Sequence, residues 1–246
     1  MRWLLIRGLS RDARHWGSFP KTFAEELGVE VQTIDPPGFG TQIARTSPST
    51  IAEITDDIRD RSNIQGDDCS ILGISLGGMV TLDWLARYPN EFQRAVVINT
   101  SASNVAPLYA RAQPAFLRAI ATAVIRRDIG KPERFERVVL GLSSNRPADE
   151  LEELGRQWAK WQREATPSRA SVLGQLRAAT RFKLPTNITT PLLVLTATND
   201  RLVSHRCSDE IAGKLRAPIR SHPTAGHDLP SDEPTWVVDQ IRDWTP

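Results

Sequence analysis

Residues 69–79 read CSILGISLGGM, an apolar run that passes directly into the pattern Gly-x-Ser-x-Gly. The run predicts a β-strand, and the residues after it predict a helix over 76–87. Gly73 and Gly77 would let the strand and the helix approach closely, and Ser75 would stand on a sharp, strained turn. Ser75 is therefore the candidate nucleophile, the alternative being a glycine-rich turn in which the serine is incidental.

Short apolar runs alternate with helical patterns on both sides of this turn. Strands that alternate with helices indicate a parallel sheet, and nearly continuous apolar strands indicate a sheet that is covered on both faces. The sequence thus predicts an α/β fold, a mostly parallel sheet of about six strands flanked by helices. The expected strands are 2–7, 29–34, 69–73, 94–99, 191–197 and 217–222, and the expected helices around them are 49–62, 76–87, 209–215 and 235–244.

Residues 104–185 interrupt this alternation, because they contain only helical patterns. They also differ in charge, with 15 Lys and Arg against 8 Asp and Glu, whereas the rest of the chain has 16 against 21. A solvated helical surface would explain this excess, and so would a lid whose field favours an anionic substrate. The candidate helices cover roughly 107–127, 132–141, 147–164 and 169–182.

The composition is typical of a soluble globular protein, with 246 residues, 40% apolar and 24% charged. A net charge of +2 gives no reason to expect a nucleic-acid partner. No run approaches the roughly 20 apolar residues of a membrane span, and the opening apolar run is too short for a signal peptide. Cys69 and Cys207 form neither a disulfide framework nor a zinc-binding pattern, so a cytoplasmic protein is expected, with its oligomeric state left open.

A nucleophilic serine needs a base, and the base needs a carboxylate to orient it. His227 follows a glycine in a loop after the last expected strand, where the active sites of open α/β sheets form. Asp200 follows the strand expected at 191–197, and it could orient a base on a neighbouring loop or cap a turn. Asp228 is less suited, because it is adjacent to His227 and projects differently. The remaining histidines are His15, His205 and His222.

The order Ser75, Asp200, His227 resembles that of the α/β-hydrolase fold superfamily. The resemblance implies a serine-hydrolase triad that needs neither a metal nor an organic cofactor. One departure is Arg7, which stands where many members of the superfamily carry a histidine. Further segments that resemble motifs of the superfamily are DPPGFG at 35–40, ATNDRLV at 197–203 and Gly-His at 226–227.

The same resemblance implies a division of the chain into two parts. An α/β-hydrolase core would comprise residues 1–103 and 186–246, and a helical cap would comprise 104–185. In the superfamily, backbone N–H groups from two loops bind the oxyanion. Their counterparts in this sequence are Leu9 and Leu76.

The expected cap also supplies candidates for a substrate pocket. Its aromatic side chains could form an apolar wall, and its arginines could bind a carboxylate. The aromatic side chains could equally pack the cap onto the core, and the arginines could end a helix, where cations interact favourably with the dipole. The candidate pocket residues are Phe116, Trp158, Trp161, Arg126 and Arg127.

Three functions are compatible with these patterns. The leading one is a serine hydrolase that cleaves a carboxylic ester of small or medium acyl size through an acyl-enzyme. The second is a carbon–carbon bond hydrolase or lyase acting on an anionic metabolite, similar to the SHCHC synthase of the menaquinone pathway. The third is a ligand-binding protein on a hydrolase scaffold. Each takes a small molecule, and none implies a nucleic acid or integral membrane association.

Overall fold

The computed structural model describes residues 1–63, 66, 68–126 and 131–244. Its described strands form one six-stranded sheet in the order β2-β1-β3-β4-β5-β6, and every neighbouring pair is parallel. The expected α/β fold with a parallel sheet of six strands is confirmed. The strands are β1 (Arg2–Ile6), β2 (Glu30–Ile34), β3 (Cys69–Ile74), β4 (Arg94–Ile98), β5 (Leu192–Ala197) and β6 (Ile219–His222).

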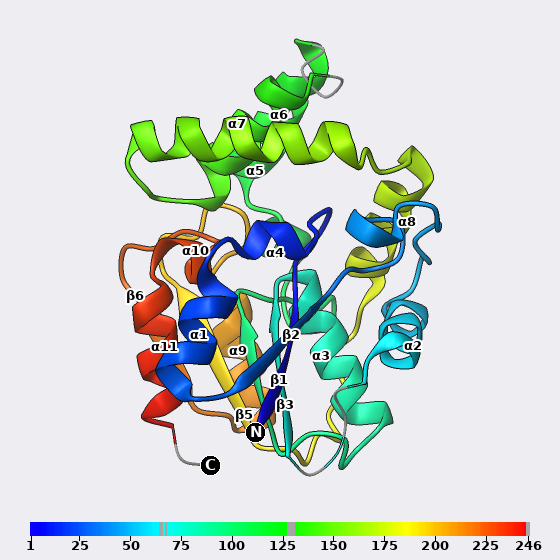
Figure 1. Cartoon of the computed structure of the whole chain (residues 1–246), viewed down its shortest axis with the longest axis vertical. Helices are drawn as coiled ribbons and strands as arrows, with labels where there is room; N and C mark the ends of the chain where they lie inside the picture. The colour runs from blue at the N-terminus through cyan, green and yellow to red at the C-terminus, as the bar shows by residue number, and fades with distance from the viewer. Residues whose placement is uncertain (64–65, 67, 127–130, 245–246) are drawn as a thin grey trace.

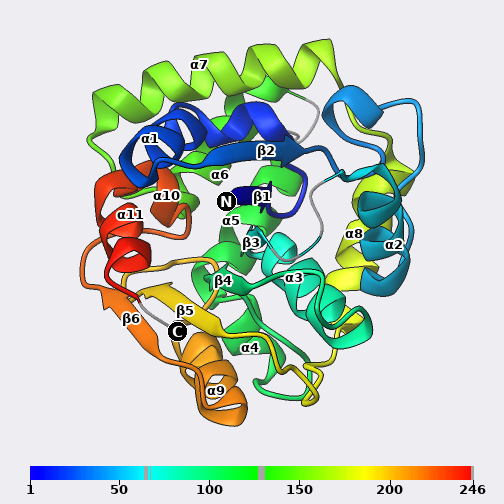
Figure 2. The same cartoon turned by 60° about the horizontal axis from the view of Figure 1, so that its bottom comes forward.

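Helices cover both faces of the sheet (Figures 1 and 2), which explains why β3 and β5 are buried over their whole length and mostly apolar. The helices α1 and α11 pack on one face, around Trp3 and Phe23. The helices α2, α3 and α9 pack on the other, around Leu4 and Ile71. Their bounds are α1 (Phe19–Leu27), α2 (Ile51–Arg61), α3 (Leu76–Arg87), α9 (Arg206–Leu215) and α11 (Pro234–Arg242).

The described residues between β4 and β5 contain helices and no strand. The helices α5, α6 and α7 lie across the carboxyl ends of the strands, and α8 lies beside α2 (Figure 1). The helix expected over 107–127 is two helices, because Pro114 lacks an N–H and begins a new helix more readily than it continues one. The bounds are α4 (Leu108–Arg111), α5 (Pro114–Ile125), α6 (Pro132–Ser143), α7 (Ala148–Glu164) and α8 (Arg169–Arg181).

Among the described residues, two α-helices are additions to the expected elements, α1 and the short α10 (Leu229–Asp232), as are the 3-10 helices η1 (Ala13–Trp16) and η2 (Gly40–Gln42). Each of the two α-helices carries a proline in its first turn, Pro20 and Pro230. Proline disrupts the interior of a helix but suits its first turn, where no N–H is needed. In the sequence, Pro20 and Pro230 suggest a break, whereas in the structure each lies in the first turn of a helix.

The strand order reverses between β1 and β3, and this point organises the carboxyl edge of the sheet. Ligands of open α/β sheets bind beyond the strand ends at such a switch point. Gly8 follows β1 and Ser75 follows β3, and a Cβ added to Gly8 would lie 3.0 Å from the Cβ of Ser75. The helix α3 lies so close to β1 that a Cβ on Gly77 would clash with the carbonyl oxygen of Ile6.

None of the helices in the described residues combines the length and the apolar character that crossing a membrane requires.

Candidate active site

Ser75 occupies the turn between β3 and α3 with φ of 57° and ψ of −118°. A positive φ is costly for a residue with a Cβ and persists only where its surroundings enforce it. Here the N–H of Ser75 donates to the carbonyl of Ile98 at 2.8 Å, and its own carbonyl accepts from Thr100 Oγ1 at 2.7 Å. A Cβ on Gly73 would clash with the carbonyl of Gly77, so glycine is required there. The turn is thus held by hydrogen bonds to residues at the end of β4 and by close packing against α3.

His227 and Asp200 meet at the carboxyl edge of the sheet, although they lie in different loops. Nδ1 of His227 lies 2.6 Å from Oδ2 of Asp200, and both side chains are buried. The other oxygen, Oδ1, accepts from the backbone N–H groups of Leu202 and Val203 at 2.7 and 2.9 Å. These bonds fix the carboxylate, so Nδ1 of the imidazole donates to it and Nε2 is left as the basic nitrogen.

Two opposing effects set the pKa of His227. Burial would lower it, because it disfavours the imidazolium. The charge of Asp200 and its hydrogen bond outweigh burial, and Asp228 adds to them, so the pKa of His227 is raised above the ordinary value for histidine. The surroundings therefore stabilise the imidazolium of His227, which is the form that results when a histidine acts as a general base and accepts a proton.

Asn99 connects the loops that hold these side chains. It is buried, follows β4 and has φ of 47°, a conformation that asparagine tolerates better than most residues. Its Nδ2 donates to the carbonyl of His227 at 2.8 Å, and its Oδ1 accepts from the N–H of Ala197 at 2.9 Å. The sequence gives only a weak signal of this role, an asparagine directly after a buried strand.

Arg7 and Asp228 form a buried ion pair beside His227. Two parallel hydrogen bonds of 2.8 Å join the guanidinium to the carboxylate, and each side chain is only 4% exposed. The guanidinium also lies 4.7 Å from the ring of Trp16. Burial would raise the pKa of Asp228, but the charge of Arg7, its hydrogen bonds and the weaker effects of His227 and Arg11 together hold that pKa below the ordinary range. Asp228 is therefore engaged with Arg7, and Asp200 is the carboxylate at Nδ1 of His227.

The loop after β1 is held by helices from between β4 and β5. The N–H of Ser10 donates to Oε1 of Gln175 on α8 at 2.7 Å, and Ser10 has φ of 56°. Arg11 pairs with Glu136 of α6 at 2.9 Å. Because Leu9 lies in this loop beside Ser10, the helices help to set the direction of the N–H group that the sequence marks as an oxyanion donor. The sequence gives no signal of these pairings.

Residues 143–146, which join α6 to α7, are bonded to both loops that carry Asp200 and His227. On the first loop, Arg201 donates to the carbonyl of Ser144 at 2.8 Å. On the second, Asp232 accepts from the Ser144 hydroxyl at 2.5 Å and from the N–H of Gly226 at 2.7 Å. The helices above the sheet are therefore tied directly to the loops of the candidate site.

The two candidate tryptophans pack against the loop after β1. The ring of Trp158 is buried, with its centre 4.9 Å from that of His15 and with Arg11 at 4.5 Å from its own centre. The ring of Trp161 lies 5.3 Å from that of His15. These contacts agree with the packing alternative, in which the side chains join the helices to the sheet.

The other pocket candidates lie on or near α5. Phe116 is half-buried, and Arg126 is exposed directly after the last residue of α5. That position is the helix end at which a cation interacts favourably with the dipole. Arg127 lies outside the described residues.

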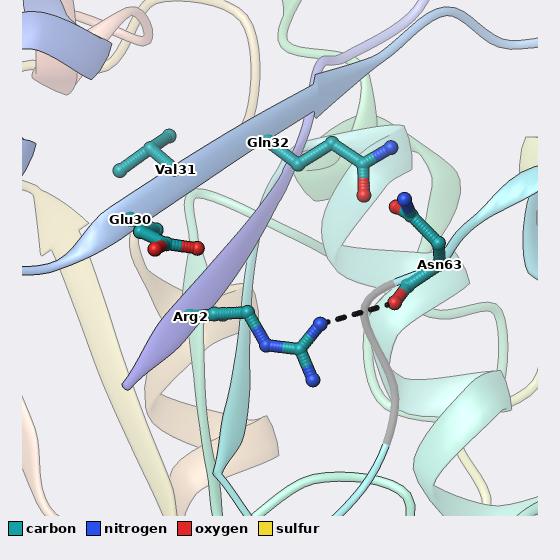
Figure 3. Close-up of a pocket in the computed structure, with 5 residues that line it drawn as sticks. All are labelled: Arg2, Glu30, Val31, Gln32 and Asn63. Atoms are coloured by element: carbon teal, nitrogen blue, oxygen red, sulfur yellow. Dashed lines mark hydrogen bonds between the residues drawn. The ribbon is translucent and has the colours of Figure 1, made fainter.

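A cavity of about 300 Å³ lies at the opposite edge of the sheet (Figure 3). It is lined by Arg2 of β1, by Glu30, Val31 and Gln32 of β2, and by Asn63. Arg2 donates to the carbonyl of Asn63 at 3.2 Å and pairs with Asp68. Because this cavity is at the amino ends of the strands, it is remote from Ser75. Among the described residues, no group of three or more His, Cys, Asp or Glu side chains could hold a metal ion.

Comparison with known proteins identifies the family. The model of the "Alpha/beta hydrolase family" matches residues 3–240. The chain belongs to this family. Membership supports a hydrolase, and the resemblance noted from the Ser75, Asp200 and His227 motifs is confirmed at the level of the family.

One curated relative of this hydrolase is the "Biotin biosynthesis bifunctional protein BioHC" of Teredinibacter turnerae. The two are 26% identical over 254 residues, which cover 97% of this chain and 43% of the relative. The hydrolase thus spans less than half the length of that protein.

Solved structures show the same fold. An esterase from Thermogutta terrifontis is 20% identical with a TM-score of 0.73, covering 99% of this chain and 89% of its own. The enol-lactonase of Burkholderia xenovorans is 21% identical with a TM-score of 0.72, covering 98% and 90%. At these identities the likeness establishes the fold of the hydrolase and leaves its substrate open.

Removing Arg7 should destabilise the hydrolase strongly. Arg7→Met leaves the Asp228 carboxylate buried and unpaired, and we expect it to lower the free energy of unfolding by about 3–5 kcal/mol. The double variant Arg7→Met/Asp228→Leu should recover part of that loss, because no buried charge remains. Urea denaturation of the single and double variants at neutral pH measures both quantities.

Arg2→Met is the matched control, since its pair with Asp68 is largely solvent-exposed. Exposed pairs contribute little to stability, because solvent screens the two charges. Equal losses for Arg7→Met and Arg2→Met would contradict the prediction.

Proposed function

We propose that this chain is a serine hydrolase that cleaves carboxylic esters of small or medium acyl size. Ser75 is the nucleophile, His227 the general base and Asp200 the carboxylate that orients it. The observation that carries the proposal is the buried contact of 2.6 Å between His227 Nδ1 and Asp200. It is supported by the strained turn of Ser75, which is hydrogen-bonded to Ile98 and Thr100, the two neighbours of Asn99.

The first half of the reaction forms an acyl-enzyme. Nε2 of His227 takes the hydroxyl proton of Ser75 as Oγ attacks the carbonyl carbon of the ester. The negative charge that develops on the carbonyl oxygen is bound by the N–H groups of Leu9 and Leu76, of which each is worth about 3 kcal/mol by analogy with other hydrolases. His227 then gives its proton to the departing alcohol as the carbon–oxygen bond breaks.

The second half releases the acid. Water attacks the acyl carbon while His227 accepts one of its protons, and that proton returns to Oγ of Ser75 when the acyl bond breaks. The Asp200 carboxylate stabilises the imidazolium in both halves. The chemistry uses groups of this chain and water, so the proposal includes neither a metal nor an organic cofactor.

The helices between β4 and β5 act as a cap in this proposal. We assign residues 104–185 to the cap and residues 1–103 and 186–246 to the hydrolase core. Support comes from the position of α5, α6 and α7 across the carboxyl edge of the sheet (Figure 1) and from the pairing of Gln175 with Ser10. Phe116 and Arg126 remain candidates for substrate contact. The cysteines Cys69 and Cys207 are free and buried, which suits a reducing cytoplasm.

The charges near Ser75 favour an ester over the anionic metabolite of the carbon–carbon alternative. Arg7 and Arg11, both in or next to the loop after β1, are each engaged in an ion pair. Arg126 is exposed at a helix end. The biotin-biosynthesis name of the curated relative belongs to a protein more than twice as long, so it suggests a metabolic setting for the ester and does not define it.

A fluorophosphonate probe should label Ser75 and no other residue. The activated hydroxyl attacks phosphorus, and peptide mass spectrometry locates the adduct. Ser75→Ala should abolish labelling, whereas Ser221→Ala, a change at an exposed serine, should leave it intact. Nitrophenyl esters of increasing acyl length then test turnover. Labelling without ester turnover would favour carbon–carbon cleavage, and stabilisation by a ligand without labelling or product would favour a binding protein.

The rate of this labelling should fall as pH decreases, because only neutral His227 accepts the proton. The pKa of His227 is raised, so the midpoint should lie above the ordinary histidine value of about 6.5. Asp200→Asn removes the charge that raises it, so the midpoint should move down, and the limiting rate should fall by about ten-thousandfold. The control is Asp60→Asn, at an exposed position. An unchanged midpoint in Asp200→Asn would refute the assigned roles.

Asn99→Ala should slow labelling by about tenfold to a hundredfold without changing the nucleophile or the base. The substitution removes the bonds to His227 and Ala197, so the two loops lose their common anchor. Labelling rates, compared at a temperature where both proteins are folded, measure the effect. Asn187→Ala, which removes one exposed bond to the carbonyl of Ala86, is the matched control. If both variants label at the wild-type rate, Asn99 has no positioning role.

A further inference from the structure

The carboxamide of Gln175 is completely buried in α8, yet only one of its ends is satisfied. Its Oε1 accepts from the N–H of Ser10 at 2.7 Å. A backbone N–H can only donate, so the atom that bonds Ser10 must be the amide oxygen of Gln175. The NH2 group of Gln175 therefore points away from this hydrogen bond. Within the described residues, that Nε2 is buried and has no hydrogen-bond partner.

The position of this NH2 group relates it to the nucleophile. Ser10 is two residues beyond Gly8, at which an added Cβ would lie 3.6 Å from Oγ of Ser75. Nε2 and Oε1 of Gln175 are attached to the same carbon, so the NH2 group lies close to the hydrogen bond with Ser10. It therefore lies beside the loop after β1, in which Gly8 borders Ser75.

A buried donor without an acceptor is costly, whereas methionine or leucine would fill the same volume with no polar atom. The hydroxyl of Ser143, at the end of α6, is a second buried polar group without a partner in the part of the chain described. The carbonyl of the same residue accepts from the N–H of Asp228, next to His227. Unsatisfied polar atoms therefore occur on two helices that contact the loops of the site.

We infer that Gln175 determines substrate specificity, its NH2 donating a hydrogen bond to an oxygen that the substrate carries in addition to its ester group. This inference rests on the proposed ester hydrolysis. The substrate class is an ester with a carbonyl, hydroxyl, ether or carboxylate oxygen in its acyl or alcohol part. Oε1 of the same side chain positions the loop of Leu9, so one residue serves both the oxyanion donor and substrate selection.

Isosteric ester pairs test this inference. On the acyl side, nitrophenyl levulinate differs from nitrophenyl valerate by a ketone in place of a methylene. On the alcohol side, methoxyethyl butyrate differs from butyl butyrate by an ether oxygen. In the wild-type protein, kcat/KM should be about tenfold higher for the oxygenated member of at least one pair. The ratio of kcat/KM between the two esters of a pair does not depend on the fraction of active protein, because that fraction affects both values equally.

Two variants separate donation from positioning. Gln175→Glu retains an acceptor for Ser10 but carries no donor once ionised, so it should lose the preference at high pH. Gln175→Met cannot donate at any pH and should lose it throughout. Gln157→Met, at an exposed position on α7, should retain the full preference.

Retention of the preference by Gln175→Met, or no preference in the wild-type protein for either pair, would overturn the inference. In that case fluorophosphonate labelling of Ser75 and hydrolysis of nitrophenyl valerate would still support the proposed function. If neither labelling nor hydrolysis occurs, the proposed function itself fails. If Gln175→Met does not fold, the ratio for Gln175→Glu at high pH decides the outcome.

Discussion

The hydrogen bonds of Asn99 hold together the three segments on which the candidate site depends. Its carboxamide joins the carbonyl of His227 to the N–H of Ala197, three residues before Asp200. Its neighbours Ile98 and Thr100 hold the backbone of Ser75 from both sides. One strand end thus fixes the relative positions of nucleophile, base and acid, and the positive φ of Asn99 is tolerated for the sake of these bonds.

The sequence predicts features that depend on neighbouring residues. The turn around Ser75 could be predicted because a strand, two glycines and a helix occur within about a dozen residues, and only a small side chain avoids the clashes there. The strands β1, β3, β4 and β5 could be predicted because each contains a nearly continuous apolar run, whereas β2 and β6 are more polar and give a weaker signal. The break at Pro114 and the start of α1 next to Pro20 were harder to predict, since proline can both end and begin a helix.

Pairings between distant residues could not be predicted in the same way. Arg7 and Asp228 are 221 positions apart, and Ser10 and Gln175 are 165 apart. Neither pair belongs to a periodic pattern, and a single sequence gives no sign that two such residues meet. The role of Asn99 could not be predicted for the same reason, because its amide bonds to two loops that are distant from it in the sequence.

Arg7 illustrates how a departure from a family pattern can be accommodated physically. A guanidinium is larger than an imidazole and always charged, so in a buried position it requires a carboxylate. Asp228 meets that requirement through two hydrogen bonds of 2.8 Å. The same pair fixes the position of Asp228, which is adjacent to His227. At His227, Asp228 raises the pKa and Arg7 lowers it, and the charge of Asp200 has a larger effect than either. The departure therefore changes how the loop is held, while Asp200 remains the carboxylate with the largest effect on the base.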